Sequence, residues 1–312
     1  MILPLIFIPD VDRQGGMPEL SQPSDPPATN APPAAQLPGV QWLPTADQTS
    51  AAELIATGDW EWQVDKNLGP VINSAADEVA ADMTADGLTL LYSATAGHWS
   101  EQDFWIATRE STSDDWNSPV KLNDAINNRL TLAHPILTPD GAAMLFSRLI
   151  APGKRTRIFF STRQSPADEW AVPERYEVEL GGHVACIDIA ADGCTQILQT
   201  ALGSANHDLL WAQRPSPDQP WGRPQFFDHS INTDDKEFTG TISSDRRLLI
   251  FERGDHRRNE QGISNADLWI TTRSSPDDPW PDPVRLEKVN SIDRDEKPRL
   301  LPDGMSFLFS SN

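Results

Sequence analysis

The sequence predicts an all-β fold, a five-bladed β-propeller built from four-stranded antiparallel blades. Five Asp-Gly-like turns lie 52 to 58 residues apart along the chain: Asp86-Gly87, Asp140-Gly141, Asp192-Gly193, Asp245-Arg246 and Asp303-Gly304. An apolar run stands on each side of every turn, and stretches similar to 267–286 (DLWITTRSSPDDPWPDPVRL) recur between the turns. A repeat of about 50 residues that holds several short strands is typical of a propeller blade.

One repeat, taken at the C-terminal end of the chain, reads as four strands. The runs around Asp303-Gly304 alternate apolar and polar residues. Asp-Gly between such runs predicts a hairpin with a type I′ turn, which needs positive φ. Residues 268–273 form a third strand, and a Ser-Pro-Asp-Asp-Pro turn leads to a fourth strand that begins at Trp280. Each repeat therefore predicts one antiparallel sheet.

These residues resemble a known repeat family. The segments DLWITTRSSPDDPW, PVRL, a VNS-like step, DEKPRLLPDG and FLFSSN are similar to the WD40-like propeller repeat called PD40, known from TolB-like proteins. The resemblance covers residue 60 to the end of the chain. It implies a TolB-like propeller, but it implies little about function, because one fold hosts many functions.

Composition divides the chain into two parts. Residues 1–48 hold a short apolar N-terminus (MILPLIFI) and a Pro-rich stretch, which predicts a disordered linker, and residues 49–312 hold the propeller. The apolar run is too short to span a bilayer and lacks the features of a secretory signal. It is either the remnant of a signal or membrane helix or a sticky terminus. A tether after an apolar segment favours an extracytoplasmic location, in a periplasm or at a cell surface.

The two ends of the repeat array are complementary. Residues 60–68 match a fourth strand, because Trp62 stands as far from Asn73 as Trp116 does from Asn127. The chain stops two strands into its last blade. We expect residues 60–68 to finish the blade that residues 305–310 begin, which closes the ring and removes exposed sheet edges. The third strand of that blade is supplied by residues 49–58, or the blade has only three strands, or the sequence is a fragment.

Charge and motifs exclude several functions. The formal net charge of −21 argues against nucleic acid as a partner, since its binders need clustered Lys and Arg. The chain has no Gly-x-Ser-x-Gly elbow, His-Glu-x-x-His, P-loop or EF-hand sequence. The repeated Trp predict packing between blades. A repeated Arg that ends the third strand in four blades predicts surface charge and turn hydrogen bonds.

Two basic loops are the first candidate for function. Variable loops on a rigid scaffold commonly carry binding, and in this acidic chain residues 148–157 and 253–262 form basic islands between predicted second and third strands. The candidate residues for an anionic partner are Arg155, Arg157, His256, Arg257 and Arg258. The alternative is that these loops are only solvated.

The mouth of the central channel is the second candidate. Acidic and histidine side chains stand near the starts of the innermost strands, and the ligand-binding candidates among them are Glu78, His134, His183, Glu237 and Glu296. Clustered carboxylates suit a divalent cation or the acid and base of a glycosidase, and the alternative is a hydrated acidic rim. We expect no resident cofactor or metal and hypothesise weak Ca²⁺ binding by Glu78, Glu237 and Glu296.

The prediction for function is a monomeric, non-catalytic binding propeller that recognises a protein, peptide or glycan through the face with the variable loops. The alternative is a carbohydrate-active enzyme that uses the channel-mouth carboxylates. Geometry separates the two predictions. Carboxylates that converge in a closed pocket with aromatic side chains favour the enzyme, whereas an open channel with dispersed charges favours the binding protein.

Overall fold

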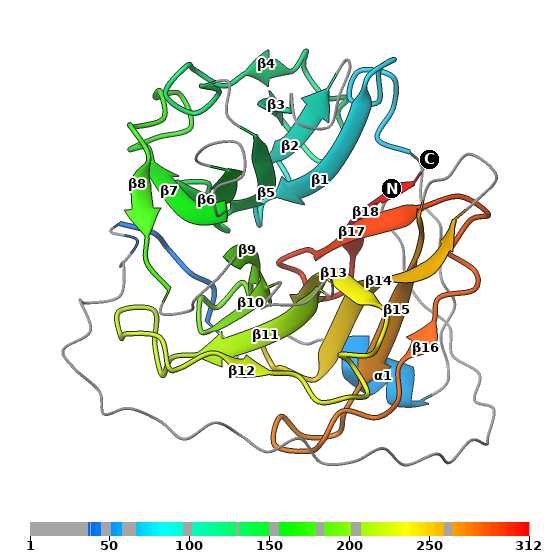
Figure 1. The fold of residues 1–312 in the computed structure, drawn as a ribbon. Helices are drawn as coiled ribbons and strands as arrows, with labels where there is room; N and C mark the ends of the chain where they lie inside the picture. The colour runs from blue at the N-terminus through cyan, green and yellow to red at the C-terminus, as the bar shows by residue number, and fades with distance from the viewer. Residues whose placement is uncertain are drawn as a thin grey trace.

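The computed structural model describes residues 37, 39–44, 51–57, 67–95, 102–128, 131–149, 156–178, 184–200, 207–258 and 264–311. In this part of the chain, eighteen strands form five antiparallel sheets, and there is one short helix, α1 (Ala51–Thr57). Each sheet keeps its strands in chain order from the centre outward, and the sheets lie around a common centre (Figure 1). The fold is therefore a β-propeller.

Blades one to four have four strands each, as the repeats predict. The first two blades are β1 (Asp77–Met83), β2 (Thr89–Thr95), β3 (Asp103–Thr108) and β4 (Val120–Lys121), then β5 (Leu132–Leu137), β6 (Ala143–Leu149), β7 (Thr156–Thr162) and β8 (Glu174–Tyr176). The next two are β9 (Val184–Ile189), β10 (Thr195–Thr200), β11 (Asp208–Gln213) and β12 (Gln225–Phe226), then β13 (Lys236–Ile242), β14 (Leu248–Arg258), β15 (Ser264–Thr272) and β16 (Val284–Arg285).

The fifth sheet differs from the prediction of five four-stranded blades. Among the described residues it has two strands, β17 (Asp295–Leu300) and β18 (Phe307–Ser311). The inner strands β1, β5, β9, β13 and β17 each contact the next one, and β17 also contacts β1. The five sheets therefore form a closed ring, of which four are complete four-stranded blades.

The Asp-Gly turns are hairpins, but they are not of type I′. Only the glycine has positive φ, with 70° at Gly87 and 68° at Gly141, and its N–H donates to the carbonyl three residues earlier. This is a type I turn followed by a left-handed residue, the pattern of a longer hairpin loop. Arg246 takes the glycine's place in blade four at a φ of 59°, a conformation that costs a non-glycine residue roughly 1–2 kcal/mol.

The repeated Arg and Trp form one structural unit in each complete blade. The guanidinium groups of Arg109, Arg163, Arg214 and Arg273 lie 4.1 to 4.5 Å from the ring centres of Trp116, Trp170, Trp221 and Trp280. Each Nε donates to the backbone carbonyl of the left-handed turn residue, for example Arg109 to Gly87 O at 2.8 Å. The arginine thus joins the first hairpin of a blade to its outer turn, which is why it recurs.

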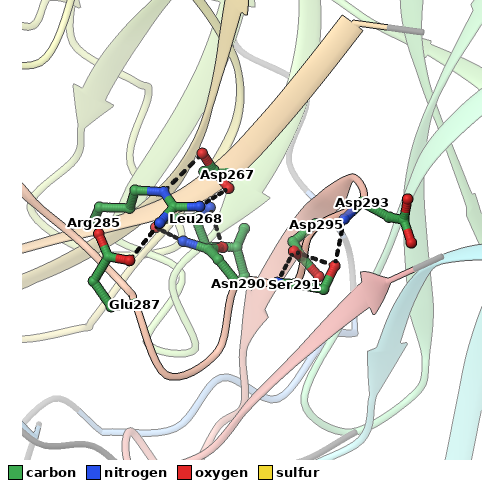
Figure 2. Close-up of polar contacts among 8 residues, drawn as sticks. All are labelled: Asp267, Leu268, Arg285, Glu287, Asn290, Ser291, Asp293 and Asp295. Carbon is green, nitrogen blue, oxygen red and sulfur yellow. Dashed lines mark hydrogen bonds and ion pairs between the residues drawn. The ribbon is translucent and has the colours of Figure 1, made fainter. Parts of the chain in front are cut away.

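A repeated asparagine fixes the step from one blade to the next. Figure 2 shows Asn290, which accepts a hydrogen bond from Leu268 N at 2.7 Å and donates to Leu268 O at 2.9 Å. Asn127 and Asn232 hold Phe104 and Leu209 in the same way. Each of these asparagines satisfies backbone groups of a third strand, so the VNS-like step is structural.

The helix α1 corrects one alternative for the missing third strand. Residues 49–58 do not supply a strand, because 51–57 form this helix. Its buried face, Ala51, Ala52 and Ile55, packs in the core between blades four and five, with Leu268 of β15 and Phe307 of β18. Small and branched apolar residues at positions i, i+1 and i+4 form such a face on a helix. The helix therefore covers apolar surface of blade four beside the short fifth sheet.

Part of the predicted Pro-rich linker has fixed contacts. Leu37 is buried in the core between blades two and three, and Leu43 N donates to Ala191 O at 3.0 Å. The Trp42 ring packs over Gly193 so closely that a Cβ there would collide with it. The composition of this stretch predicts no fixed structure, but its apolar side chains Leu37 and Trp42 pack against the propeller.

The predicted closure by residues 60–68 lies mostly outside the described residues. Of this segment Asn67 and Leu68 are described. Leu68, and Ile72 just after it, pack in the core between blades five and one, against Leu90, Leu301 and Leu308. Ile72 occupies the position that Ile126 has between blades one and two. The pairing of residues 60–66 with β18 stays a prediction.

Candidate functional site

The acidic residues near the innermost strands belong to a repeated loop. In three blades a Ser or Thr stands four residues before an acid and hydrogen-bonds to it: Ser74 to Glu78, Thr233 to Glu237 and Ser291 to Asp295. Figure 2 shows this contact at Asp295, which accepts bonds from both the N–H and the hydroxyl of Ser291. The carboxylate caps the turn that enters the blade, so its recurrence has a structural reason.

The repeat also shows that Glu296 is not the counterpart of Glu78 and Glu237. Asp295 is, because it lies at the same distance before the hairpin turn and makes the same contact. The hypothesis that groups Glu296 with Glu78 and Glu237 is therefore shifted by one residue in blade five, and both the spacing to the turn and the contact with Ser291 identify Asp295.

Glu237 is fully buried in an ion pair. Its side chain has no exposed surface, and Arg253 Nε lies 2.9 Å from Oε1. Burial raises the pKa of Glu237, while hydrogen bonds from Thr233 and the charge of Arg253 act in the opposite direction. A carboxylate that is enclosed and paired in this way has no access to a ligand.

At the channel mouth, blade five contributes a network of paired charges. Arg294 Nη2 lies 2.7 Å from Glu252 Oε1 and 2.9 Å from Glu296 Oε2, and Lys297 Nζ lies 3.8 Å from both acids. Glu252 is completely buried and also accepts a bond from Thr239 Oγ1 at 2.8 Å. Burial raises the pKa of Glu296, and nearby Glu252 raises it further against the effect of Lys297 and Arg294. Arg294 and Lys297 therefore balance the charges of Glu252 and Glu296.

His134 lies in the same part of the channel. Together with Ala80, Thr239 and Lys297 it lines a cavity of about 20 Å³. Burial lowers the pKa of His134 well below its usual value, and Lys297 and His207 lower it further. His134 and Lys297 have φ of 52° and 57°, because a bulge interrupts the inner strands at this level. The positive charge of Lys297 beside His134 disfavours a metal cation at this place, and among the described residues no group of three potential ligands includes His134.

Deeper in the channel, three charged side chains from three blades meet. Arg299 Nε lies 2.9 Å from Asp82 Oδ1, and Arg299 Nη1 forms an ion pair with Asp188 Oδ1. Asp82 also accepts from Leu137 N at 2.6 Å, and Asp188 accepts from Ile242 N at 2.9 Å. The two aspartates are almost fully buried, with side chains 1% and 2% exposed. Through these contacts the triplet joins all five blades.

The basic islands are only partly described. Their first residues, Arg148 and Arg253, are structural: each donates to backbone carbonyls of the preceding blade step and stacks on aromatic rings of its own blade. Arg157 in β7 is partly exposed. The backbone of His256, Arg257 and Arg258 belongs to β14, and their side chains lie outside the description, as Arg155 and His183 do entirely.

The predicted Ca²⁺ ligands do not assemble. Among the residues that the structure describes, no three His, Cys, Asp or Glu side chains are grouped so that they could hold a metal ion. Glu237 is paired with Arg253, Glu296 with Arg294, and Glu78 with Ser74. Each partner satisfies a carboxylate that the Ca²⁺ hypothesis needs.

Sequence reasoning missed the ion-paired residues of the channel, namely Asp82, Asp188, Glu252, Arg294 and Arg299. The signal for Asp82, Asp188 and Arg299 is present but faint. They occupy equivalent positions of their repeats, four residues before the Asp of the Asp-Gly turn. The other two blades have Ile136 and Thr241 at this position. A charged residue in an inner strand that alternates with apolar neighbours points to a buried ion pair.

Comparison with known proteins gives fold neighbours. No protein-family model matches the chain, and no curated protein matches it. A putative TolB from Agrobacterium tumefaciens aligns at 16% identity over 77% of this chain and 72% of its own, with a TM-score of 0.46. TolB from Acinetobacter baumannii aligns at 16% identity over 75% of this chain and 48% of its own, with a TM-score of 0.44. An α-L-arabinanase from Penicillium chrysogenum, complexed with arabinobiose, aligns at 14% identity over 76% and 74%, with a TM-score of 0.47.

These neighbours bear on the fold alone. No described helix has the length and apolar character needed to cross a membrane. The functional conclusion therefore has to come from the contacts within the propeller.

Proposed function

We propose that this chain is a non-catalytic binding propeller that recognises a protein, peptide or glycan partner through the face bearing the loops between second and third strands. The observation that carries the proposal is the state of the channel. Arg299 forms a buried triplet with Asp82 and Asp188 inside it, and Arg294 and Lys297 pair with Glu252 and Glu296. A glycosidase needs two accessible carboxyl groups that flank the scissile bond, and the paired acids described here do not offer them.

The loop face supplies what a binding surface needs. A rigid ring holds loops of unequal length and composition, and binding sites concentrate on loops of this kind. Two of the loops are basic in a chain of net charge −21. Local positive charge on an otherwise acidic protein steers an anionic partner to one face and repels it from the others.

The test is a charge reversal with a matched control. Arg155, Arg157, Arg257 and Arg258 are changed to Glu in one variant, and the exposed cations Lys121, Arg175, Arg223 and Lys288 in the other. Both variants change the net charge equally. Partners are identified with glycan arrays and by cross-linking in cell extract, and affinity is measured at low and physiological salt. We expect the loop variant to lose affinity and salt dependence while the control keeps both. Equal behaviour of the two variants would contradict the proposal.

One observation favours the alternative, a carbohydrate-active enzyme. Glu296 has a raised pKa and retains some exposed surface, and a general acid needs both properties. Hydrolysis of plant and bacterial polysaccharides by the wild type, abolished in Glu296→Gln, would replace the binding proposal with this one. An exported, surface-held location is part of the proposal and is tested by fractionating the native cells.

A further inference from the structure

Blade four holds an arginine in a well-defined setting. Arg253 Nη2 donates to the carbonyl oxygens of Ser230 and Ile231 at 3.0 Å each, and its Nε faces Glu237 at 2.9 Å. The guanidinium group lies 5.1 Å from the ring centre of Phe251 and 4.7 Å from that of Trp269. Carbonyl oxygens, a carboxylate and two aromatic rings together satisfy this planar cation.

Blade two repeats this setting. Arg148 Nη2 donates to Ile126 O at 3.0 Å, and its guanidinium group lies 5.1 Å and 4.9 Å from the ring centres of Phe146 and Phe159. Leu132 takes the place of the carboxylate in this blade. In both blades the arginine thus links its own blade to the step that leads from the preceding blade.

Blade one has the same surroundings but no arginine. Ala94 lies opposite Glu78 across the β1–β2 pair, as Arg253 lies opposite Glu237. Tyr92 and Trp105 face each other across β2 and β3, as Phe251 and Trp269 do across β14 and β15. Ser74 holds Glu78 as Thr233 holds Glu237. The carboxylate, its hydroxyl partner and the two aromatic rings of the arginine's surroundings thus have counterparts in blade one, and Ala94 stands where the arginine would be.

A cavity is lined by Glu78 and Tyr92, the counterparts of Glu237 and Phe251. It has a volume of about 90 Å³ and lies at the seam of blades five and one, lined by Ile72, Glu78, Tyr92, Phe309, Ser310 and Ser311. A single water needs a cavity of only about 10–15 Å³, so there is room for a larger group. Glu78 is partly exposed, which leaves the cavity open to solvent. Burial, and then the charge of Glu78, raise the pKa of Tyr92 to about 12, so its hydroxyl stays a neutral donor.

We propose that this cavity, named here the seam cavity, binds a guanidinium group from outside the chain. The group would take the place of the missing arginine: charge-paired with Glu78, stacked beside Tyr92, and bonded to carbonyl oxygens of the step before Asn73. A guanidinium group fits better than an ammonium group, because it is planar, stacks on rings and donates in several directions. The site is independent of the basic loops, so the failure of either proposal leaves the other standing.

The probes are ethylguanidinium chloride and, as its ammonium counterpart, ethylammonium chloride, each titrated into the full chain at millimolar concentration. NMR shifts and Tyr and Trp fluorescence report binding. A second arm uses the peptides Gly-Arg-Gly and Gly-Lys-Gly, which separates a free guanidinium compound from an arginine side chain of a partner. We expect saturable binding of at least one guanidinium probe, with at least tenfold weaker binding of its ammonium counterpart.

Three variants make the assignment specific. Glu78→Gln should weaken binding at least tenfold, whereas Asp77→Asn, which removes the neighbouring exposed charge, should change it less than twofold. Ala94→Arg supplies the group internally, so it should abolish binding and raise the melting temperature. If Ala94→Arg fails to fold, Glu78→Gln and Asp77→Asn still decide the question. Absence of saturable binding in both arms, or equal binding by Glu78→Gln and the wild type, would overturn the proposal.

Discussion

At the scale of single residues, the central fact is that charges from different blades are used to hold the ring together. Arg299 has two nearly buried carboxylates as partners, and these in turn accept backbone N–H groups of blades two and four. Desolvation of such a triplet costs several kcal/mol, which only complete pairing repays. Loss of one member therefore has a larger effect than the loss of an outer ion pair.

The first prediction concerns Arg299. Arg299→Met leaves Asp82 and Asp188 buried without their cation, and we expect it to lower the free energy of unfolding by about 3–5 kcal/mol. Arg175→Met is the control, because it removes an exposed pair with Glu177 that is worth at most about 1 kcal/mol. Urea unfolding measures both variants. Equal losses would show that the triplet has no special role.

The second prediction concerns pH and His134. Because burial lowers its folded-state pKa, the unfolded chain takes up a proton first as pH falls through about 6.5. The stability that neutral His134 contributes is therefore fully present above pH 6.5 and is lost progressively below it, with a slope of at most about 1.4 kcal/mol per pH unit. His134→Asn, which tolerates the left-handed backbone, should reduce this slope. Denaturant unfolding between pH 5 and 8 measures it, and parallel curves for the two proteins would refute the assignment.

At the scale of elements, the blades can be predicted because they follow the repeat. The segments that interrupt the repeat cannot be predicted in this way. Strands, hairpins and outer turns recur in every repeat, so one blade interprets another. The helix α1 has no counterpart in the other repeats. Its seven residues are too few to show the hydrophobic periodicity that predicts a helix. The repeat spacing to the hairpin turn identifies Asp295 and not Glu296 as the counterpart of Glu78, and the contact with Ser291 confirms it. The partners of Arg299 come from blades one and three, and no local spacing in the sequence joins them. The PD40 resemblance itself stays a prediction.

The third prediction concerns α1. Ile55 is buried between blades four and five, so Ile55→Ala should lower the free energy of unfolding by about 2–4 kcal/mol through lost burial and the space left behind. Glu53 lies on the outer side of the same helix, with its side chain 64% exposed in an ion pair with Arg247. Glu53→Ala should therefore stay within about 1 kcal/mol of the wild type. Thermal and urea unfolding compare them, and a negligible effect of Ile55→Ala would mean that the helix only rests on the surface.

At the scale of the whole molecule, a propeller depends on the seam where its ends meet. Inner strands β17 and β1 contact each other, and Ile72 lies in the core between blades five and one. Among the described residues, the sheet of blade five has two strands, β17 and β18. In a closed ring, each sheet is supported on both sides, so weakening one seam lowers the stability of all blades together.

The last prediction tests how that seam is completed, with two truncated chains. Deleting residues 1–58 removes α1 and the segment at 37–44 but retains residues 60–68. Deleting residues 1–68 removes the expected closing strand as well. If residues 60–68 pair with β18, the longer deletion loses strand hydrogen bonds and apolar burial on top of the losses common to both. A change of one kcal/mol in the free energy of unfolding shifts the melting temperature of a domain of this size by roughly 2–4 °C. We expect the loss of the strand to cost several kcal/mol. We therefore expect the chain without residues 1–68 to melt about 10 °C or more below the chain without residues 1–58. Coincident melting curves for the two truncated chains would mean that the ring is closed without this strand, by β17 and β1 alone.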